Sequence, residues 1–313
     1  MAEIIASTKG MDRAKWLEIR SNYIGGSDAG IILGVNKYKT AFELWLEKTK
    51  QIVPEEINND AIHFGNVLED IVAQEFAERT GKKVRKKNQM LQHEDYPFMM
   101  ANLDRVIVGE NAFLECKTAS AYLAKEWEAD EIPSSYLAQV NHYMAVGGYE
   151  KAYIACLIGG QKFIWKEIQR DEELIEIIIQ AEKIFWDVHV LAGYAPALDG
   201  SSAAEQYVKN RFPSSTKQKA IGLAAAHKDN IEKYLFLKEQ IAELTGQQKQ
   251  IENLIKMDLG DAESGSISKF IVNWKSVVSN RVDAKALKAD YPEIYAKVTK
   301  ESHSRRFEIK GEK

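Results

Sequence analysis

The sequence predicts an α/β fold, in which a mixed central sheet is flanked by helices and followed by a C-terminal extension. Helical patterns come first, strand-like runs follow, and a helix, a strand pair and a long helix complete this part, an order typical of helices packed on a mixed sheet. The 313 residues are 45% apolar, which is enough for a sizeable core and suggests about two domains. After "NRFPSST" (residues 210–216) the pattern changes, so we place the domain boundary between residues 1–212 and 213–313.

The N-terminal helices are marked by capping residues and apolar spacing. "DRAKWLEIRSNYIGGSDAGIILG" (residues 12–34) predicts a short helix, a glycine turn and a second helix with Ser27 at its N-cap. "TAFELWLEKTK" (residues 40–50) predicts a further helix. "FGNVLEDIVAQEFAERTG" predicts a strongly helical segment that stops at Gly81. Its expected buried face consists of Phe64, Leu68, Ile71, Val72 and Phe76.

The middle of the chain supplies the expected sheet. "MLQHE", "MMANLDRVIV" and "AFLECKT" (residues 90–94, 99–108 and 112–118) have the apolar character of strands. "SSYLAQVNHYMAVGG" (residues 134–148) predicts a helix that starts at serines and ends at paired glycines. "KAYIACLIGG" and "KFIWKEI" predict a β-hairpin, and "DEELIEIIIQAEKIFWDVHVLAG" (residues 171–193) predicts a long helix.

The C-terminal part predicts a coiled-coil helix. Apolar residues recur there at alternating steps of three and four. Either this helix forms a helical hairpin with residues 216–232, or it serves oligomerisation or partner docking, and Gln248 weakens the case for a long oligomeric coil. Two antiparallel strands are expected over residues 266–274 and 275–282, and a helix over residues 283–298. The seam positions are Tyr234, Leu237, Ile241, Leu244, Gln248, Ile251 and Ile255.

Composition narrows the class of protein. The two cysteines, Cys116 and Cys156, lack the spacing of a zinc finger or a redox motif. The N-terminal residues lack the apolar core of a signal peptide and no run approaches the ~18 apolar residues of a membrane span, so we expect a cytoplasmic protein. The net charge of −4 divides into −8 for residues 1–212 and +4 for residues 213–313. Inward carboxylates in the acidic part would need cations and a basic extension suits phosphates, although ordinary solvated charge explains the same counts.

A predicted hairpin brings three charged residues to one face. Gly109-Glu110-Asn111 separates two apolar strands as a turn. With Gly109 and Glu110 in a two-residue loop, Asp104 lies opposite Glu115. With Glu110 and Asn111 in the loop, Asp104 lies opposite Lys117. In both registers the three charged side chains share one face, because side chains of a strand alternate with a period of two.

Two carboxylates that face each other across a strand pair repel, unless a cation lies between them. Either Asp104 and Glu115 share a divalent cation, or Asp104 pairs with Lys117 and Glu115 reaches solvent. Ligands that are all oxygen suit Mg²⁺ or Mn²⁺. Beside such an ion, Lys117 would orient a water molecule or stabilise charge that develops on a phosphate.

At these residues the chain resembles the YqaJ/phage-lambda-type exonuclease family of the PD-(D/E)XK nuclease superfamily. Four segments match in order: "WLEIRSNYIGGSDAGIILG", "FGNVLEDIVAQEFAERTG", "ANLDRVIV…AFLECKT" and "LAQVNHYMAVGG". The D…ExK pattern alone is weak evidence, whereas the four blocks in order are specific. The resemblance implies a restriction-endonuclease-like mixed central sheet and a nuclease with two Mg²⁺ ions, or Mn²⁺ in their place, in each active site.

The resemblance also implies a role for individual residues. It implies metal ligands on the strand pair and on the preceding helix, together with a catalytic lysine. Asp70 and Glu75 are rival acids on that helix, and spacing alone favours a solvated acid at the position of the helical ligand. The implied set is Asp104, Glu115, the backbone carbonyl of Cys116, Glu69 and Lys117.

Three further residues match positions that contact DNA in this family, and a fourth candidate for DNA binding, Tyr143, lies beside one of them. Gln139 matches the glutamine beside the scissile phosphate, and Tyr143 follows on the same side of the helix. Arg20 and Ser27 match the 5′-phosphate pocket, where an arginine makes bidentate contacts and a helix N-terminus attracts anions. The alternatives are a Gln139 satisfied by backbone groups, a surface ion pair at Arg20, and a plain N-cap at Ser27.

Two positions depart from the family pattern. Leu103 stands where the motif has a proline, and Asn102 stands where the family often has a serine that touches phosphate. Asn102 can still donate a hydrogen bond. The branch of nucleases with an iron–sulfur cluster needs four cysteines, and this chain has two.

The function implied by the resemblance is Mg²⁺-dependent 5′-to-3′ degradation of one strand of linear duplex DNA. The product, a 3′ overhang, would suit a RecT/beta-type single-strand annealing protein of phage-type recombination, and relatives imply a possible trimeric ring. The alternatives are an endonuclease that cuts internal sites and a DNA-binding or assembly scaffold with little activity. "KKVRKK" (residues 82–87) is the candidate for sequence-independent contact with the duplex backbone, or is a solvated loop.

Overall fold

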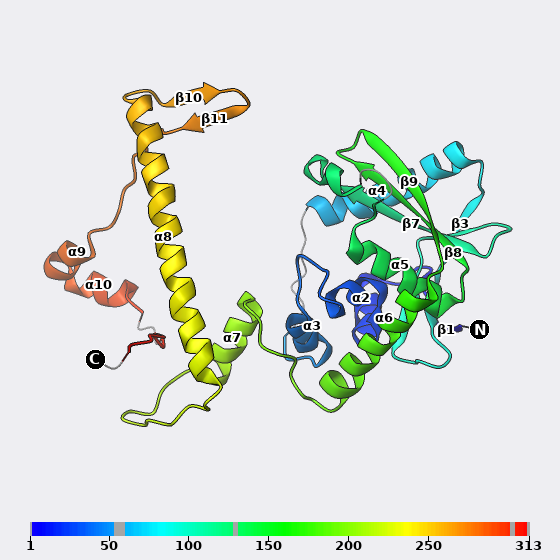
Figure 1. Cartoon of the computed structure of the whole chain (residues 1–313), viewed down its shortest axis with the longest axis horizontal. Helices are drawn as coiled ribbons and strands as arrows, with labels where there is room; N and C mark the ends of the chain where they lie inside the picture. Colours follow the sequence, from blue (N-terminus) through cyan, green and yellow to red (C-terminus); the bar gives the residue numbers. More distant parts are fainter. Residues whose placement is uncertain (1, 53–59, 128–130, 301–303, 312–313) are drawn as a thin grey trace. The chain divides into compact units, whose positions relative to one another are not determined.

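The chain divides into two compact units, Met1–Val208 and Lys209–Lys313. The computed structural model describes residues 2–52, 60–127, 131–300 and 304–311 (Figure 1). The division falls within the helix α7 (Ser202–Arg211), a few residues before the boundary expected from the sequence. No described helix combines the length and the apolar character needed to span a bilayer.

The N-terminal unit contains two mixed sheets. In the five-stranded sheet, with order β3-β6-β7-β8-β9, the central pair β7–β8 is parallel and the other pairs are antiparallel. In the four-stranded sheet, with order β1-β4-β5-β2, only β2–β5 is parallel. The first sheet consists of Val84–Lys86, Arg105–Ile107, Ala112–Ala119, Lys151–Ile158 and Lys162–Gln169. The second consists of Glu3–Ser7, Gln89–Gln92, Met99–Asn102 and Ile24–Gly25.

Helices cover both faces of the five-stranded sheet. On one face, Val72 and Phe76 of α4 pack on Leu114 of β7. On the other face, Val140 of α5 belongs to the larger core with Phe113 of β7. This arrangement confirms the predicted mixed sheet flanked by helices. The helices are α1 (Arg13–Ser21), α2 (Gly26–Ile32), α3 (Ala41–Lys48), α4 (Asp60–Thr80), α5 (Ser134–Gly147) and α6 (Glu172–Ile184), with a 3-10 turn η1 (Ala121–Trp127) and a π-helical turn η2 (Phe185–Leu191).

The run expected as one strand over residues 99–108 is broken. Its halves, β5 and β6, belong to different sheets, with Leu103 and Asp104 between them. Strands β1 and β3 lie outside the expected strands. The expected face of α4 is only partly right: Val72 and Phe76 are buried, but Phe64 and Ile71 are 53% and 52% exposed. The helix ends as expected at Gly81, whose φ of +71° is readily adopted only without a side chain.

The C-terminal unit consists of the long helix α8 (His227–Leu259), a hairpin and two short helices, α9 (Ala284–Asp290) and α10 (Pro292–Val298). The hairpin pairs β10 (Ser264–Ile267) with β11 (Phe270–Asn273), so its turn falls inside the run expected as one strand, and residues 275–282 are not a strand. The expected helix over residues 283–298 divides at Pro292, which starts α10 because proline fits the first turn of a helix. Residues 216–226 are not helical, so the helical hairpin with residues 216–232 is wrong.

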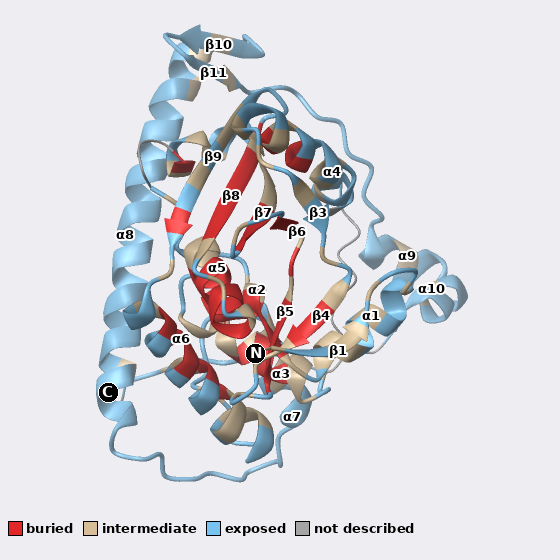
Figure 2. Cartoon of the chain, turned by 90° about the vertical axis from the view of Figure 1, so that its right-hand side faces the viewer, coloured by how far each residue is buried: buried red, intermediate tan, exposed pale blue. Residues whose placement is uncertain are grey.

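Burial differs sharply between the units. In the N-terminal unit, strand β8 and helix α5 are largely buried, and β7 is buried over its first half (Figure 2). In the C-terminal unit, none of the residues in the described ranges 209–300 and 304–311 is buried. The candidate active site therefore lies on the unit that has a core.

Candidate active site

The β6–β7 hairpin has the first of the two predicted registers. Arg105 lies opposite Leu114, and Val106 lies opposite Phe113. Continued by one residue, this register places Asp104 level with Glu115. The backbone N–H of Cys116 donates a hydrogen bond of 2.8 Å to Asp104 Oδ2, so the residue at the break between the sheets is tied to β7.

Glu115 is a buried carboxylate that is only partly satisfied. Its side chain points to the α5 side of the sheet, where Oε1 accepts hydrogen bonds from Lys117 Nζ at 2.7 Å and Gln139 Nε2 at 2.8 Å. Its other oxygen, Oε2, is buried without a hydrogen-bond partner. A buried carboxylate oxygen without a partner is costly, so this atom needs a cation or a donor. The predicted alternative, in which Glu115 reaches solvent, is wrong because the residue is 3% exposed.

Lys117 is held as a cation. Its Nζ also donates to Gln139 Oε1 at 3.0 Å and lies 4.9 Å from the centroid of the Tyr136 ring. Burial alone would lower the pKa of Lys117, but the charges of Glu115 and Asp104 raise it above its usual value. A lysine that stays protonated donates hydrogen bonds and positive charge, and it does not remove a proton from water near neutral pH.

Asp104 lies in a region of negative potential. Burial raises the pKa of Asp104 well above its usual value, and the charges of Glu115 and Glu69 raise it further. Lys117 and the Cys116 N–H offset this only in part. Acidic groups that raise one another's pKa in this way are stabilised in their ionised form by a divalent cation.

Arg105 is a residue of this site that the sequence analysis did not identify. It is 4% exposed, and its Nη1 donates to Glu69 Oε1 at 2.6 Å and to the Asp104 carbonyl at 2.7 Å. Its Nη2 contacts Asp70. The available signal was an arginine inside the apolar run "LDRVIV". Of the rival acids, Asp70 also pairs with Lys86 at 2.8 Å, and Glu75 pairs with Arg79 at 2.6 Å.

The oxygen atoms around Asp104 and Glu115 are of the type that binds a divalent cation, but they are not arranged around a single ion position. Asn102 Oδ1 is buried without a partner, like Glu115 Oε2, so two oxygens near the break in the strand lack donors. Within the described ranges, no three His, Cys, Asp or Glu side chains are already grouped around one ion position. Glu69 is held by Arg105, and it would have to leave that ion pair to join the set. The ligand role of the Cys116 carbonyl stays a prediction.

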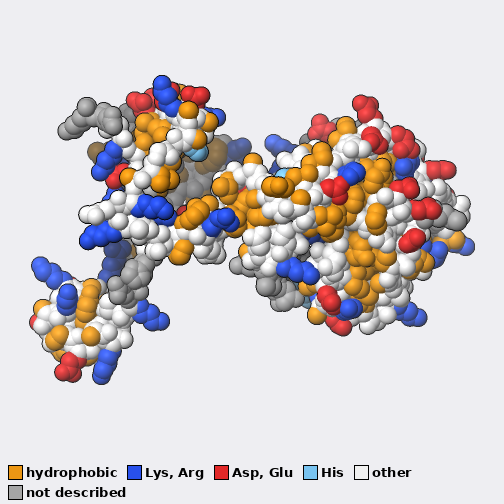
Figure 3. Space-filling view, turned by 90° about the horizontal axis from the view of Figure 1, so that it is seen from below, with side chains coloured by type: hydrophobic (Ala, Val, Ile, Leu, Met, Phe, Trp, Pro, Cys, Tyr) orange, Lys and Arg blue, Asp and Glu red, His pale blue; other side chains and the backbone are white. Residues whose placement is uncertain are grey.

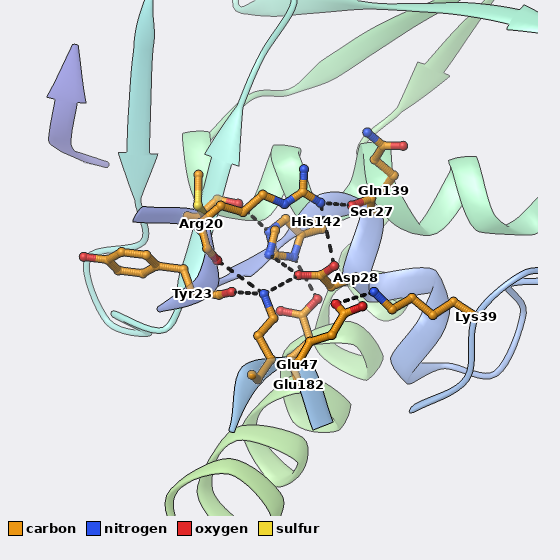
Figure 4. A network of polar contacts seen from close by, with 12 residues as sticks. Arg20, Tyr23, Ser27, Asp28, Lys39, Glu47, Gln139, His142 and Glu182 are labelled. Atoms are coloured by element: carbon orange, nitrogen blue, oxygen red, sulfur yellow. Dashed lines mark hydrogen bonds and ion pairs between the residues drawn. The ribbon is translucent and has the colours of Figure 1, made fainter. Parts of the chain in front are cut away.

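Arg20 and Ser27 lie together in a second cluster (Figure 4). An Nη atom of Arg20 contacts Ser27 Oγ and lies 3.7 Å from Asp28 Oδ1. The Arg20 guanidinium also lies 5.1 Å from the centroid of the Trp16 ring. The predicted N-cap at Ser27 is wrong, because α2 starts at Gly26 and its N-cap is Gly25. A hydroxyl and a guanidinium that face each other here offer donors to a phosphate.

Asp28 and Lys48 form a buried ion pair beneath this cluster. Lys48 Nζ lies 2.8 Å from Asp28 Oδ2, and both side chains are less than a tenth exposed. Burial alone would raise the pKa of Asp28, but Lys48 and Arg20 lower it below its usual value. Sequence reasoning missed this pair, for which the only signal was an acid inside "GGSDAGIILG". It fixes the start of α2 beneath Arg20.

His142 and Glu182 form a second buried pair that the sequence analysis missed. His142 Nδ1 lies 2.8 Å from Glu182 Oε1, and Nε2 lies 2.9 Å from the Met100 carbonyl. Burial alone would lower the pKa of His142, but Glu182 and the Met100 carbonyl raise it. The pair joins α5, α6 and β5.

The ion pair of His142 and Glu182 should make the stability of the fold depend on pH. The pKa of His142 is raised in the folded state. Its contribution to the free energy of unfolding is therefore complete below the pKa of the unfolded chain, about 6.5, and is lost as the pH rises through the pKa of the folded chain. We expect the melting temperature of the parent chain to exceed that of His142→Gln most at pH 5.5, and less at each step to pH 9. The exposed His63, changed to Gln, is the control. An advantage that grows with pH would contradict this assignment.

Gln139 and Tyr143 connect the two clusters. Gln139 Nε2 lies 3.3 Å from the Tyr143 hydroxyl, and both residues are buried. Gln139 is therefore satisfied by side chains and not by the backbone. A Cβ atom at Gly26 would lie 2.4 Å from the Tyr143 ring, so glycine is required where α2 meets α5.

The basic cluster of residues 82–87 is part of a strand. Residues Val84–Lys86 form β3, so the alternative prediction of a solvated loop is wrong for these residues. Lys82 is paired with Glu110 at 2.5 Å and Lys86 with Asp70. Lys83 and Arg85 are exposed and remain candidates for contact with a duplex backbone.

A cavity of about 450 Å³ lies beside Tyr136, next to the cluster of Glu115, Lys117 and Gln139. Tyr136, whose ring contacts Lys117, lines it together with Trp127, Tyr38 and Ala119 at the end of β7. Its volume is in the range of small-ligand sites, so a nucleotide-sized group has room next to Lys117.

Comparisons with known proteins identify relatives of this chain. A family model described as the YqaJ-like viral recombinase domain matches residues 15–150. A relative from Bacillus subtilis (strain 168), named "Uncharacterized protein YqaJ", is 57% identical over 311 residues, which is 99% of this chain and 98% of the relative. An alkaline exonuclease from Laribacter hongkongensis has a TM-score of 0.48 and 17% identity, over 63% of this chain and 97% of that one. A phage-related exonuclease from Haemophilus somnus 129PT has a TM-score of 0.42 and 16% identity, over 55% of this chain and 96% of that one.

Proposed function

Because the chain belongs to the YqaJ family, we propose that it is a metal-dependent nuclease that degrades one strand of linear duplex DNA from its 5′ end. One observation carries the proposal. The buried Glu115 has one oxygen held by Lys117 and Gln139 and the other without a partner, next to an Asp104 whose pKa is raised. Such a cluster is unfavourable without a cation and is typical of phosphodiester hydrolysis with one.

The ions would be held by oxygen atoms. Asp104 and Glu115 would be the main ligands, with the Cys116 carbonyl, and with Glu69 once it leaves Arg105. Two Mg²⁺ ions, or Mn²⁺ in their place, would supply charge for the phosphate oxygens and lower the pKa of a bound water. Oxygen-only ligation favours these ions over zinc or copper.

The chain's own groups orient the scissile phosphate. The Lys117 ammonium would donate to a phosphate oxygen or to the attacking water, which lies beside one of the ions. Gln139 fixes Lys117 and Glu115 through its two amide atoms. Gln139 therefore positions the lysine, and the cavity beside Tyr136 gives room for a nucleotide.

The polarity would be set by Arg20 and Ser27. A terminal 5′ phosphate would accept from the Arg20 guanidinium, which now donates to Ser27 Oγ, and from the Ser27 hydroxyl, and Tyr143 lies near them across Gly26. Digestion from that end would leave a 3′ overhang, the substrate of a RecT/beta-type single-strand annealing protein. A role in viral recombination agrees with the description of the family.

The phosphate pocket can be tested on linear duplexes with and without a 5′ phosphate, in the presence of Mg²⁺. We expect the parent chain to prefer the phosphorylated end by about 10- to 100-fold, the size of one or two charge-assisted hydrogen bonds. Arg20→Ala should bring this ratio close to one, whereas Arg85→Ala, on exposed β3, should retain it. A parent chain without end preference would remove the pocket from the mechanism.

Covalently closed circular DNA separates this activity from an endonuclease. An enzyme that needs an end leaves closed circles intact, whereas cleavage of closed circles would support the endonuclease. Binding without degradation of either substrate would support a scaffold.

A further inference from the structure

The acids of the candidate metal site are held by donors of the chain itself. Asp104 and Glu115 accept hydrogen bonds from groups of β7 and α5, whereas Glu69 accepts from Arg105 at 2.6 Å. Acidic side chains predominate on the face of the N-terminal unit that Figure 3 presents, in agreement with the net charge of −8 for residues 1–212. Arg105 is therefore a positive charge that an acidic unit keeps next to one of its expected metal ligands.

Arg105 holds Glu69 on the side of the five-stranded sheet that faces α4. Arg105 lies opposite Leu114, and Leu114 packs in the core with residues of α4. Because side chains alternate along a strand, Glu115 points to the other side, toward α5. The charge of Glu69 nevertheless raises the pKa of Asp104, so these two carboxylates are close. Glu69 thus lies near enough to exchange the arginine for an ion held at Asp104.

Arg105 has other acceptors that can keep it paired when Glu69 leaves. Its Nη2 contacts Asp70, and its Nη1 also donates to the Asp104 carbonyl at 2.7 Å. Arg105 is 4% exposed, and a buried guanidinium without an acidic partner is costly. Asp70 is 67% exposed and shares its charge with Lys86, an exposed residue. Two adjacent acids of α4 therefore let the arginine release one carboxylate while it stays paired with the other.

We propose that Arg105 is an internal counter-cation that holds Glu69 until a divalent cation binds, and that Asp70 retains the arginine when Glu69 moves to the ion. Arg105 is then a positioning residue, which sets how readily the site takes up metal and does not touch the phosphate. The inference rests on the proposed function, because it takes Glu69 to be a metal ligand. Each ion that gains Glu69 must displace a charge-assisted hydrogen bond, which lowers the affinity of the site for metal.

Binding of Mn²⁺ to the full-length chain without DNA, measured by titration calorimetry, tests this exchange. Arg105→Gln frees Glu69 and should tighten Mn²⁺ binding at least about tenfold, the size of one charge-assisted hydrogen bond. Asp70→Asn leaves Arg105 more dependent on Glu69 and should weaken binding roughly two- to fivefold, as for a mostly exposed ion pair. The charge-matched controls, Lys86→Gln and Glu75→Gln, remove charges that do not contact Glu69, and each should change the affinity less than about twofold.

A double-mutant cycle tests whether Arg105 acts through Glu69. Glu69→Gln should weaken Mn²⁺ binding, and adding Arg105→Gln to it should bring no gain, because the ligand that the arginine withholds is then absent. Circular dichroism checks the fold of each variant, and Asp70→Asn, at an exposed side chain, tests the exchange independently of any loss of stability in Arg105→Gln.

The outcomes separate this inference from the proposed function. Weaker or unchanged binding by folded Arg105→Gln, a gain that persists in the Glu69→Gln background, or tighter binding by Asp70→Asn would each overturn the role of Arg105. Any of these results would leave a metal-dependent nuclease in place. A parent chain that binds no Mn²⁺ would instead remove the proposed function, and the role of Arg105 with it.

Discussion

Replacing Lys117 with alanine is expected to lower the rate of duplex degradation roughly a thousandfold while DNA binding is retained. The side chain places an ammonium 2.7 Å from Glu115 Oε1, and it also contacts Gln139. Its loss removes a donor and a positive charge from the position where charge develops on the phosphate. The measurement is release of acid-soluble nucleotides from a linear duplex in Mg²⁺, with binding measured in EDTA.

The matched controls separate chemistry from folding and from general charge. Lys86→Ala removes a lysine from β3 that pairs with exposed Asp70, and it should degrade DNA at close to the parent rate. Lys117→Ala leaves the buried carboxylate of Glu115 without its ammonium, so its melting temperature should fall in EDTA and recover in Mg²⁺, and the rates are compared in Mg²⁺ well below the melting temperature. Degradation by Lys117→Ala at the parent rate would show that this lysine has no part in the reaction.

The largest effect on stability is expected from Lys48→Met. This substitution leaves the buried carboxylate of Asp28 without its main partner, because Arg20 lies farther away at 3.7 Å. Removing one member of a buried pair costs about 3–5 kcal/mol. For a unit of this size, that corresponds to a fall in melting temperature of roughly 10 °C.

A neighbouring pair provides the comparison for this prediction. Lys39, just before α3, pairs with Glu47 of α3, but their side chains are 26% and 17% exposed, so Lys39→Met should cost less. Asp28→Asn combined with Lys48→Met should recover part of the lost stability, since no buried charge then remains unpaired. A small loss in Lys48→Met and a larger one in Lys39→Met would show that the buried pair is not the stronger contributor.

The parts of the site that sequence reasoning predicted are those fixed by local geometry. Glu115 and Lys117 are two residues apart on one strand, so they share a face wherever that strand lies. The turn at Gly109 and Glu110 fixes the register that brings Asp104 level with Glu115. Gln139 was reached only through the family resemblance, and the structure places it against both Glu115 and Lys117.

The parts that were missed depend on contacts between distant segments. The apolar run from Met99 to Val108 gives no sign that its halves join different sheets, because both halves are equally apolar. Arg105 is buried by two acids from α4, and nothing in its own strand indicates them. In the same way, Asp28 acquires Lys48, and His142 acquires Glu182, only once α2, α3, α5 and α6 have packed.

The C-terminal helix shows a third situation. The spacing from Tyr234 to Ile255 correctly predicted a helix with an apolar stripe. The same spacing does not specify which segment covers the stripe, and the choice of residues 216–232 was wrong because the helix starts only at His227. The spacing of apolar residues identifies the apolar face of α8, but it does not identify the segment that covers this face.

The break between β5 and β6 places Asp104 at the end of a chain segment that leads back to Arg20 through strand pairing. Arg20 lies in the last turn of α1, shortly before β2, whose Ile24 pairs with Met99 of β5, and Leu103 and Asp104 follow β5. Under the proposed function, a DNA end held by Arg20 would act on the strand that precedes Asp104, while Glu115 lies on the other sheet. Binding of the terminal 5′ phosphate by Arg20 would thus change the distance between the carboxylates of Asp104 and Glu115. An unphosphorylated end should consequently reduce kcat, and not only raise KM.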